Sequence, residues 1–182
     1  MCSSEPISDT LLVCILMENK LLKALHWIIG ILNKYNVQYI ISGGFSAYLY
    51  GSNRKINDID IDIPEDDFEK IYNDVKDFII LGPKDYKDER WDLKLMTLNY
   101  FAQKIDISGA FNQKIFDDIS QKWVHSPTNF SKSRKIKVDG IELNVIDPND
   151  LMNYKKLLSG EHQKIDIKAV QEFIKNSKSV SL

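Results

Sequence analysis

Three aspartates alternate with isoleucines in the sequence DIDIDI, and their spacing suits metal chemistry. Successive side chains of a β-strand point to opposite faces, so Asp58, Asp60 and Asp62 would share one face and the isoleucines the other. Carboxylate oxygens are the hard ligands that Mg²⁺ prefers. Two or three carboxylates that hold two divalent ions about 3.5–4 Å apart can stabilise in-line phosphoryl displacement. A bound metal would also relieve the repulsion among these like charges.

A further aspartate between two isoleucines, Asp106, occurs in the later segment KIDIS. It could reach the same metal from a neighbouring strand, although a solvent-facing strand position is the alternative. Asp62 is expected to be an exposed neighbour of the site rather than a ligand. An acidic strand edge that discourages aggregation would also account for the aspartates. That alternative leaves the glycines that precede them unexplained.

A glycine pair, Gly43-Gly44, separates a short apolar strand beginning at Val37 from a short helix at 45–51. Glycine lets a phosphate approach backbone N–H groups without a side-chain clash. Arg54 follows on the next loop, and a guanidinium group forks well onto phosphate oxygens. We therefore expect these three residues to contact a phosphate-bearing ligand, with an ordinary turn and a surface arginine as the alternative.

The periodicity of apolar residues predicts a mixture of helices and strands. Helices are expected at 18–36, 45–51, 65–78, 112–122, 147–159 and 163–176, and strands at 37–42, 57–63, 134–138 and 141–146, with two more within 91–108. Prominent hairpins, one of them turning at Asp139-Gly140, indicate an α+β fold around a small mixed sheet. A length of 182 residues suits one domain, 1–182, whose core at about 37–146 carries the N-terminal and C-terminal helices.

Composition excludes several classes of protein. A formal net charge of −2 argues against a strongly basic nucleic-acid coat. Two cysteines, Cys2 and Cys14, cannot form a disulfide framework or a structural zinc site, and they fit a reducing compartment. The apolar run at 11–17 is shorter than the roughly 20 residues that span a bilayer, and no basic segment precedes it. We expect a cytoplasmic protein without a membrane association.

The glycine pair, a gap of thirteen residues and the sequence DIDI resemble the signature of the DNA polymerase β-like nucleotidyltransferase superfamily. The stretch GGFSAYLYGSNRKINDIDIDI is similar to its small bacterial branch, which includes AbiE-type toxins and the aminoglycoside and lincosamide nucleotidyltransferases. The resemblance implies a nucleotidyltransferase-type sheet with flanking helices. It also implies that Asp58 and Asp60 are the metal pair, because Asp60 and Asp62 would lengthen the gap, and that Asp106 is the third carboxylate.

The C-terminal stretch DPNDLMNYKKLLSGEHQKIDIKAV resembles the corresponding region of AbiE-type proteins more loosely. An asparagine stands where that region usually has an acid, and its basic run after the glycine is not reproduced. The resemblance places Lys155 on the family's lysine and Asp166 on its later aspartate. It implies that Lys155 binds the nucleotide together with Gly43, Gly44 and Arg54, against the alternative of a solvated lysine.

The resemblance implies an enzyme that uses Mg²⁺, or Mn²⁺, to transfer a nucleoside monophosphate from an NTP to a hydroxyl acceptor. Asp58 and Asp60 would hold the metal on the triphosphate, and Asp106 would bind a second ion or accept the proton of the acceptor. An antibiotic, a protein side chain and a tRNA end remain open as acceptors, and small size favours the first two. The alternatives are a catalytically silent nucleotide-binding protein, a toxin or antitoxin partner, and a structural acidic module.

Overall fold

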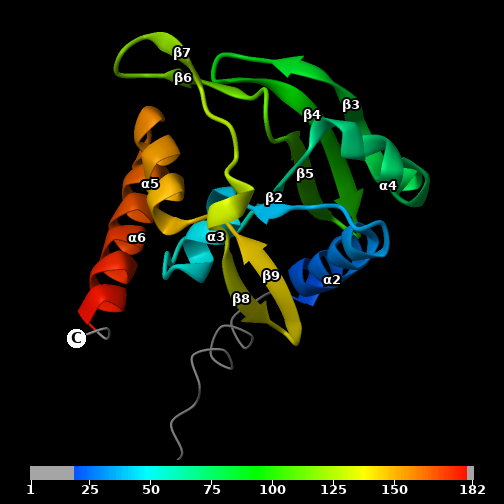
Figure 1. Cartoon of the computed structure of the whole chain (residues 1–182), viewed down its shortest axis with the longest axis horizontal. Coiled ribbons are helices and arrows are strands. Elements are labelled where there is room, and N and C mark those ends of the chain that lie inside the picture. Colours follow the sequence, from blue (N-terminus) through cyan, green and yellow to red (C-terminus); the bar gives the residue numbers. More distant parts are fainter. Residues whose placement is uncertain (1–18, 180–182) are drawn as a thin grey trace, which may run out of the picture.

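The computed structural model describes residues 19–179, which combine a mixed sheet with flanking helices (Figure 1). The helices are α2 (Asn19–Lys34), α3 (Gly43–Leu49), α4 (Phe68–Val75), α5 (Pro148–Leu157) and α6 (Glu161–Ser179). The strands are β1 (Ile40–Ile41), β2 (Asp58–Ile63), β3 (Ile79–Lys87), β4 (Trp91–Tyr100), β5 (Gln103–Gly109), β6 (Lys114–Asp117), β7 (Lys122–His125), β8 (Arg134–Val138) and β9 (Ile141–Val145). The two cysteines, the apolar run at 11–17 and the first residue of the predicted N-terminal helix lie outside the described residues.

The strands form one sheet in the order β7-β6-β4-β5-β2-β1-β9-β8, and β3 pairs with β4 beside this path. The pairs β2–β5 and β1–β9 are parallel and the other pairs are antiparallel, so the sheet is mixed as predicted. The parallel register of β2 and β5 places Asp60 opposite Asp106. The two strands that carry the predicted metal ligands are therefore neighbours.

The alternation of β2 fixes which face of the sheet joins the core. Ile59, Ile61 and Ile63 are fully buried, and they belong to the same hydrophobic cluster as Leu25 and Ile28 of α2. Burial of each isoleucine side chain contributes about 1.5–3 kcal/mol. A slip of one residue would exchange the isoleucines for the aspartates, so the register is strongly specified.

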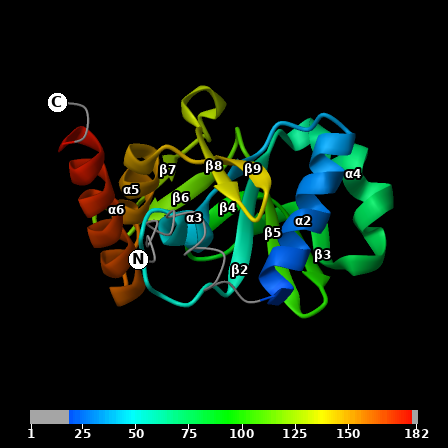
Figure 2. The same cartoon turned by 90° about the horizontal axis from the view of Figure 1, so that it is seen from below.

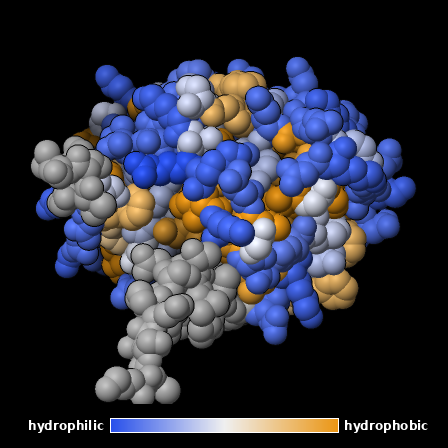
Figure 3. All heavy atoms as spheres, turned by 60° about the horizontal axis from the view of Figure 1, so that its bottom comes forward, coloured by the Kyte–Doolittle hydropathy of each residue, from blue (hydrophilic) through white to orange (hydrophobic). Residues whose placement is uncertain are grey.

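Four of the helices form two groups at opposite ends of the described structure. In both views α5 and α6 lie side by side at one end, and α2 and α4 lie at the other (Figures 1 and 2). Helix α5 begins where Asp147 accepts hydrogen bonds from the backbone N–H groups of Asn149 and Asp150. The face in Figure 3 is mostly hydrophilic, with hydrophobic atoms in patches between polar side chains. Within residues 19–179, no helix combines the length and the apolar character that a membrane crossing requires.

The helix predicted at 112–122 is wrong, because β6 and β7 form a hairpin there. Ile115 lies opposite Val124, and Phe116 lies opposite Trp123 with ring centroids 5.5 Å apart. β-Branched and aromatic side chains that face each other across two strands stabilise a sheet rather than a helix. This pairing becomes visible only when both strands are considered together.

Strand β3 was not predicted from the sequence. Its pairing with β4 shifts in register between Leu81 and Lys84, on either side of Gly82 and Pro83. Proline lacks the N–H group of a sheet hydrogen bond and is confined to edge strands and bulges. The Gly-Pro pair therefore argued against a strand in the sequence, although β3 does pair with β4 on either side of it.

Candidate active site

Three carboxylates meet on the polar face of the two parallel strands. Asp58, Asp60 and Asp106 each offer an oxygen, and these oxygens all lie within 4.8 Å of one another. A set of ligands composed of carboxylate oxygens fits Mg²⁺ or Mn²⁺ better than a soft metal. The structure brings together the three residues that were predicted to bind metal, and their metal-binding role remains a prediction.

Asp60 lies at the centre of this negative charge. Burial raises the pKa of Asp60 to about 7, and the nearby charges of Asp58, Asp106 and Asp62 act in the same direction. The backbone N–H of Gly44 donates a hydrogen bond of 3.3 Å to Asp60 Oδ2 and opposes this shift. A cation among the three carboxylates would favour the ionised form of Asp60.

Asp106 has a partner on each of its carboxylate oxygens. Thr97 Oγ1 donates a hydrogen bond of 2.7 Å to Oδ1, and Lys104 Nζ donates one of 2.7 Å to Oδ2. The ammonium of Lys104 also lies 4.0 Å from Asp58 Oδ2. Sequence reasoning missed Lys104, although its position two residues before Asp106 on one strand places both side chains on the same face.

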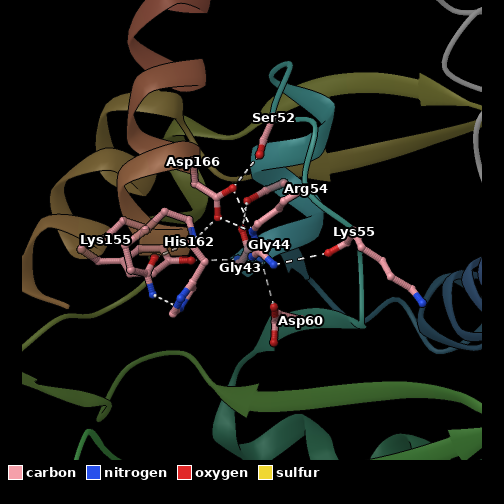
Figure 4. Close-up of polar contacts among 12 residues, drawn as sticks. Gly43, Gly44, Ser52, Arg54, Lys55, Asp60, Lys155, His162 and Asp166 are labelled. Carbon is pink, nitrogen blue, oxygen red and sulfur yellow. Dashed lines mark hydrogen bonds and ion pairs between the residues drawn. The ribbon is translucent and has the colours of Figure 1, made fainter. Parts of the chain in front are cut away.

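The glycine pair leaves room for two charged side chains (Figure 4). Gly43 has a φ of +63°, and a Cβ atom there would lie 1.6 Å from Asp60 Oδ2. A Cβ atom on Gly44 would lie 2.1 Å from Arg54 Nη2. The N–H of Gly43 donates to the hydroxyl of Tyr154 at 2.9 Å. The positive φ favours glycine at position 43, and the Asp60 carboxylate and the Arg54 guanidinium occupy the space that side chains at 43 and 44 would need.

Arg54 and Lys155 share one buried carboxylate, that of Asp166 (Figure 4). Arg54 Nε lies 2.9 Å from both oxygens of Asp166, and Lys155 Nζ lies 2.9 Å from Oδ2. Ser52 Oγ donates a further hydrogen bond of 2.7 Å to Asp166 Oδ1. Lys155 is only 2% exposed, and burial lowers its pKa while Asp166 opposes that effect. These contacts join α5 and α6 to the loop after α3.

Asp62 is buried, contrary to the expectation of an exposed neighbour. The residue is 6% exposed, and its carboxylate accepts hydrogen bonds from Ser42 Oγ at 3.4 Å and Thr128 Oγ1 at 2.7 Å. Gln113 donates in turn to Thr128 Oγ1 at 2.8 Å. Burial raises the pKa of Asp62 to about 6. This network connects the floor of the site to the loop between β7 and β8.

The carboxylates open into a cleft of about 1100 Å³. Its lining includes Asp58, Asp60, Asp106 and Gly43, whereas Gly44, Arg54 and Lys155 are not part of it. Of the predicted nucleotide contacts, Gly43 alone therefore faces the cleft, and the contacts of the other three with a nucleotide remain predictions. Away from the three carboxylates the lining contains apolar and neutral polar residues together with aromatic and acidic ones. It includes Tyr86, Asp88, Trp91, Phe111, Phe130 and Asp150.

Similarity to solved structures identifies the fold. The fold resembles a proposed nucleotidyltransferase from Thermotoga maritima, TM1012, with a TM-score of 0.65 and 18% identity over 88% of this chain and 96% of that chain. It resembles the lincosamide antibiotic adenylyltransferase LnuA with a TM-score of 0.56 and 15% identity, over 83% and 96% of the two chains. For ANT(2″)-Ia in complex with adenylyl-2″-tobramycin the TM-score is 0.54 and the identity 13%, over 89% and 99%. The fold is that of a nucleotidyltransferase.

A match to a protein-family model identifies the family within this fold. The model of the aminoglycoside-2″-adenylyltransferase family matches residues 24–170, which include the whole cleft. The chain therefore belongs to this family and is a nucleotidyltransferase. No curated protein matches the sequence. The small bacterial branch of the superfamily that the glycine pair and DIDI sequence indicated is thereby confirmed.

Proposed function

We propose that the protein transfers a nucleoside monophosphate, with Mg²⁺ or Mn²⁺, from an NTP to a hydroxyl group of a small molecule. The observation that carries this proposal is the meeting of Asp58, Asp60 and Asp106 within 4.8 Å on the floor of the cleft. Divalent ions there would neutralise the triphosphate and the charge that develops during displacement. Membership of the adenylyltransferase family makes ATP the first donor to test.

The transfer makes one bond and breaks one. The oxygen of the acceptor hydroxyl attacks the α-phosphorus, the bond from that phosphorus to the bridging oxygen of pyrophosphate breaks, and pyrophosphate leaves. Asp58 and Asp60 would hold the divalent ion that binds the triphosphate of the donor. The proton of the acceptor hydroxyl passes to Asp106, whose carboxylate faces the same cleft, or to solvent water where Asp106 instead completes the ligand set.

The cleft favours a small acceptor that carries positive charge. Asp88 and Asp150 lie in its lining together with Tyr86 and Trp91, and aromatic faces and carboxylates attract cations. The resembling structures contain lincomycin and adenylyl-2″-tobramycin, which are small molecules. The basic segment at 131–137, which would serve a tRNA acceptor, lies outside the cleft lining. No comparison supports a toxin or antitoxin partner.

Transfer assays with substituted carboxylates test the proposal. The protein is incubated with α-labelled ATP, Mg²⁺ and a panel of aminoglycosides and lincosamides, and labelled products are separated. Asp58→Asn, Asp60→Asn and Asp106→Asn should each lower transfer about 100-fold or more, because metal ligation contributes several kcal/mol to such reactions. Asp92→Asn, which removes a carboxylate outside the cleft, should retain activity. Calorimetric binding of ATP with Mg²⁺ but without turnover would favour a silent nucleotide-binding protein.

A further inference from the structure

Lys104 is a positive charge inside the carboxylate cluster. It begins the face of β5 that continues with Asp106, and the parallel register places it opposite Asp58. Its ammonium lies 2.7 Å from Asp106 Oδ2 and 4.0 Å from Asp58 Oδ2. It lines the same cleft as both carboxylates. The ammonium therefore lies beside the carboxylates of two of the three residues expected to bind a divalent ion.

The two side chains that donate hydrogen bonds to Asp106 differ in how easily they can move away from it. Thr97 is buried, and its position opposite Asp106 in the β4–β5 ladder fixes its hydroxyl beside Oδ1. Lys104 is attached through a flexible stem, and its side chain is 48% exposed. Oδ2, the oxygen that Lys104 contacts, is consequently the one that can be released. A divalent ion and an ammonium cannot both occupy it without strong repulsion.

We propose that Lys104 is a built-in competitor of the divalent ion: its ammonium occupies the ligand oxygen of Asp106 and weakens the binding of free metal. This inference rests on the proposed function, because it assumes that the cluster binds metal. Triphosphate adds negative charge that attracts both cations, and a lysine ammonium released from Asp106 can contact phosphate oxygens. Lys104 thus couples metal binding to the presence of the nucleotide.

Direct titration with Mn²⁺ in the absence of nucleotide tests this role. Free Mn²⁺ is followed by electron paramagnetic resonance in the full chain and in Lys104→Met, which keeps the stem and removes the charge. Lys104→Met should bind Mn²⁺ about tenfold more tightly, because one unit charge a few ångströms from the ion is lost. Lys104→Arg, which keeps the charge, should bind as weakly as the unsubstituted chain.

Lys114→Met is the matched control. Its side chain is 50% exposed and pairs with Asp92 at 3.8 Å, and it changes net charge equally without touching the cluster. Mn²⁺ affinity should be unchanged in this variant. The rise in melting temperature on adding Mn²⁺ provides a second measurement, and it should be larger in Lys104→Met than in the unsubstituted chain.

These measurements distinguish a failure of the role of Lys104 from a failure of the proposed metal site. Equal or weaker Mn²⁺ binding by Lys104→Met would overturn the role of Lys104 and leave the metal site intact. Mn²⁺ binding that is absent from both proteins, or that survives Asp58→Asn and Asp60→Asn, would overturn the metal site and this inference with it. Tighter binding in Lys104→Met that is lost again when Asp106→Asn is added would support the competition.

Discussion

Replacement of Asp60 by asparagine should stabilise the metal-free protein at neutral and alkaline pH. Burial and the neighbouring carboxylates raise the pKa of Asp60 from 3.8 to about 7. Between these values the folded chain keeps a proton that the unfolded chain releases, so the stability of the unsubstituted protein falls as pH rises. Asparagine has no proton to lose and can still accept the hydrogen bond of the Gly44 N–H.

The size of this effect follows from the two pKa values. The interval from 3.8 to about 7 corresponds to about 4 kcal/mol of unfolding free energy at pH 8. The carboxylate opens into a cleft, where solvent screens it, so we expect about 2 kcal/mol. At pH 4.5 the difference between Asp60→Asn and the unsubstituted protein should fall below about 1 kcal/mol, because Asp60 is mostly protonated in the folded chain there.

Urea unfolding in EDTA at pH 4.5 and pH 8 measures these differences. Asp92→Asn serves as a control in which the change in unfolding free energy should have the opposite sign. Asp92 is an exposed carboxylate whose pKa is lowered by its hydrogen bond to Lys87, so its replacement should slightly destabilise the protein at pH 8. Mg²⁺ should stabilise the unsubstituted protein and have a smaller effect on Asp60→Asn.

Two outcomes would refute this reasoning. A loss of stability in Asp60→Asn at pH 8 would mean that the folded chain favours the charged carboxylate even without metal. A gain that is the same at pH 4.5 and pH 8 would mean that ionisation of Asp60 is not its cause. Either result would remove the argument that the cluster needs a cation.

Two further substitutions test how the site is held. Gly43→Ala should lower the unfolding free energy by about 2 kcal/mol or more and abolish transfer, because its Cβ would lie 1.6 Å from Asp60 Oδ2 at a φ of +63°; normal urea unfolding and activity would contradict this. Asp166→Asn should cost about 3 kcal/mol in urea unfolding, because it leaves the buried Lys155 ammonium without a charged partner; a loss that Lys155→Met does not partly restore would contradict this.

The pair of carboxylates on β2 was predictable because its geometry is local. Period-two alternation alone placed Asp58 and Asp60 on one face, and the buried isoleucines specify the register. Asp106 joined them through a repeated Ile-Asp-Ile pattern, although only the parallel β2–β5 pairing shows that it lies opposite Asp60. The same period places Lys104 on the face of Asp106, although the sequence alone does not show that its ammonium contacts that carboxylate.

The contacts that the sequence did not reveal join distant segments. Arg54 is separated by 112 residues from its partner Asp166, and Asp62 is separated by 66 residues from Thr128. No local period predicts which buried carboxylate receives which donor. The expectation of an exposed Asp62 therefore lacked the tertiary pairing that buries its carboxylate, and the ion pair of Arg54 with Asp166 was not foreseen.

The hairpin of β6 and β7 illustrates the same limit for secondary structure. Residues 112–122 contain acids and apolar residues at spacings compatible with a helix. Pairing of Phe116 with Trp123 and of Ile115 with Val124 outweighs that local preference. The hairpin matters for function because Ile115 lines the cleft.

The most direct test of the central claim is a parallel incubation with ATP labelled at either the α- or the γ-phosphate, with Mg²⁺ and the acceptor panel. Nucleotidyl transfer predicts that the α-label joins the acceptor while the γ-label leaves in pyrophosphate. It also predicts that both events disappear in Asp58→Asn and Asp60→Asn. A γ-label found on the acceptor, or α-label transfer that persists in these variants, would contradict the assignment of the carboxylates as the site of nucleotidyl transfer.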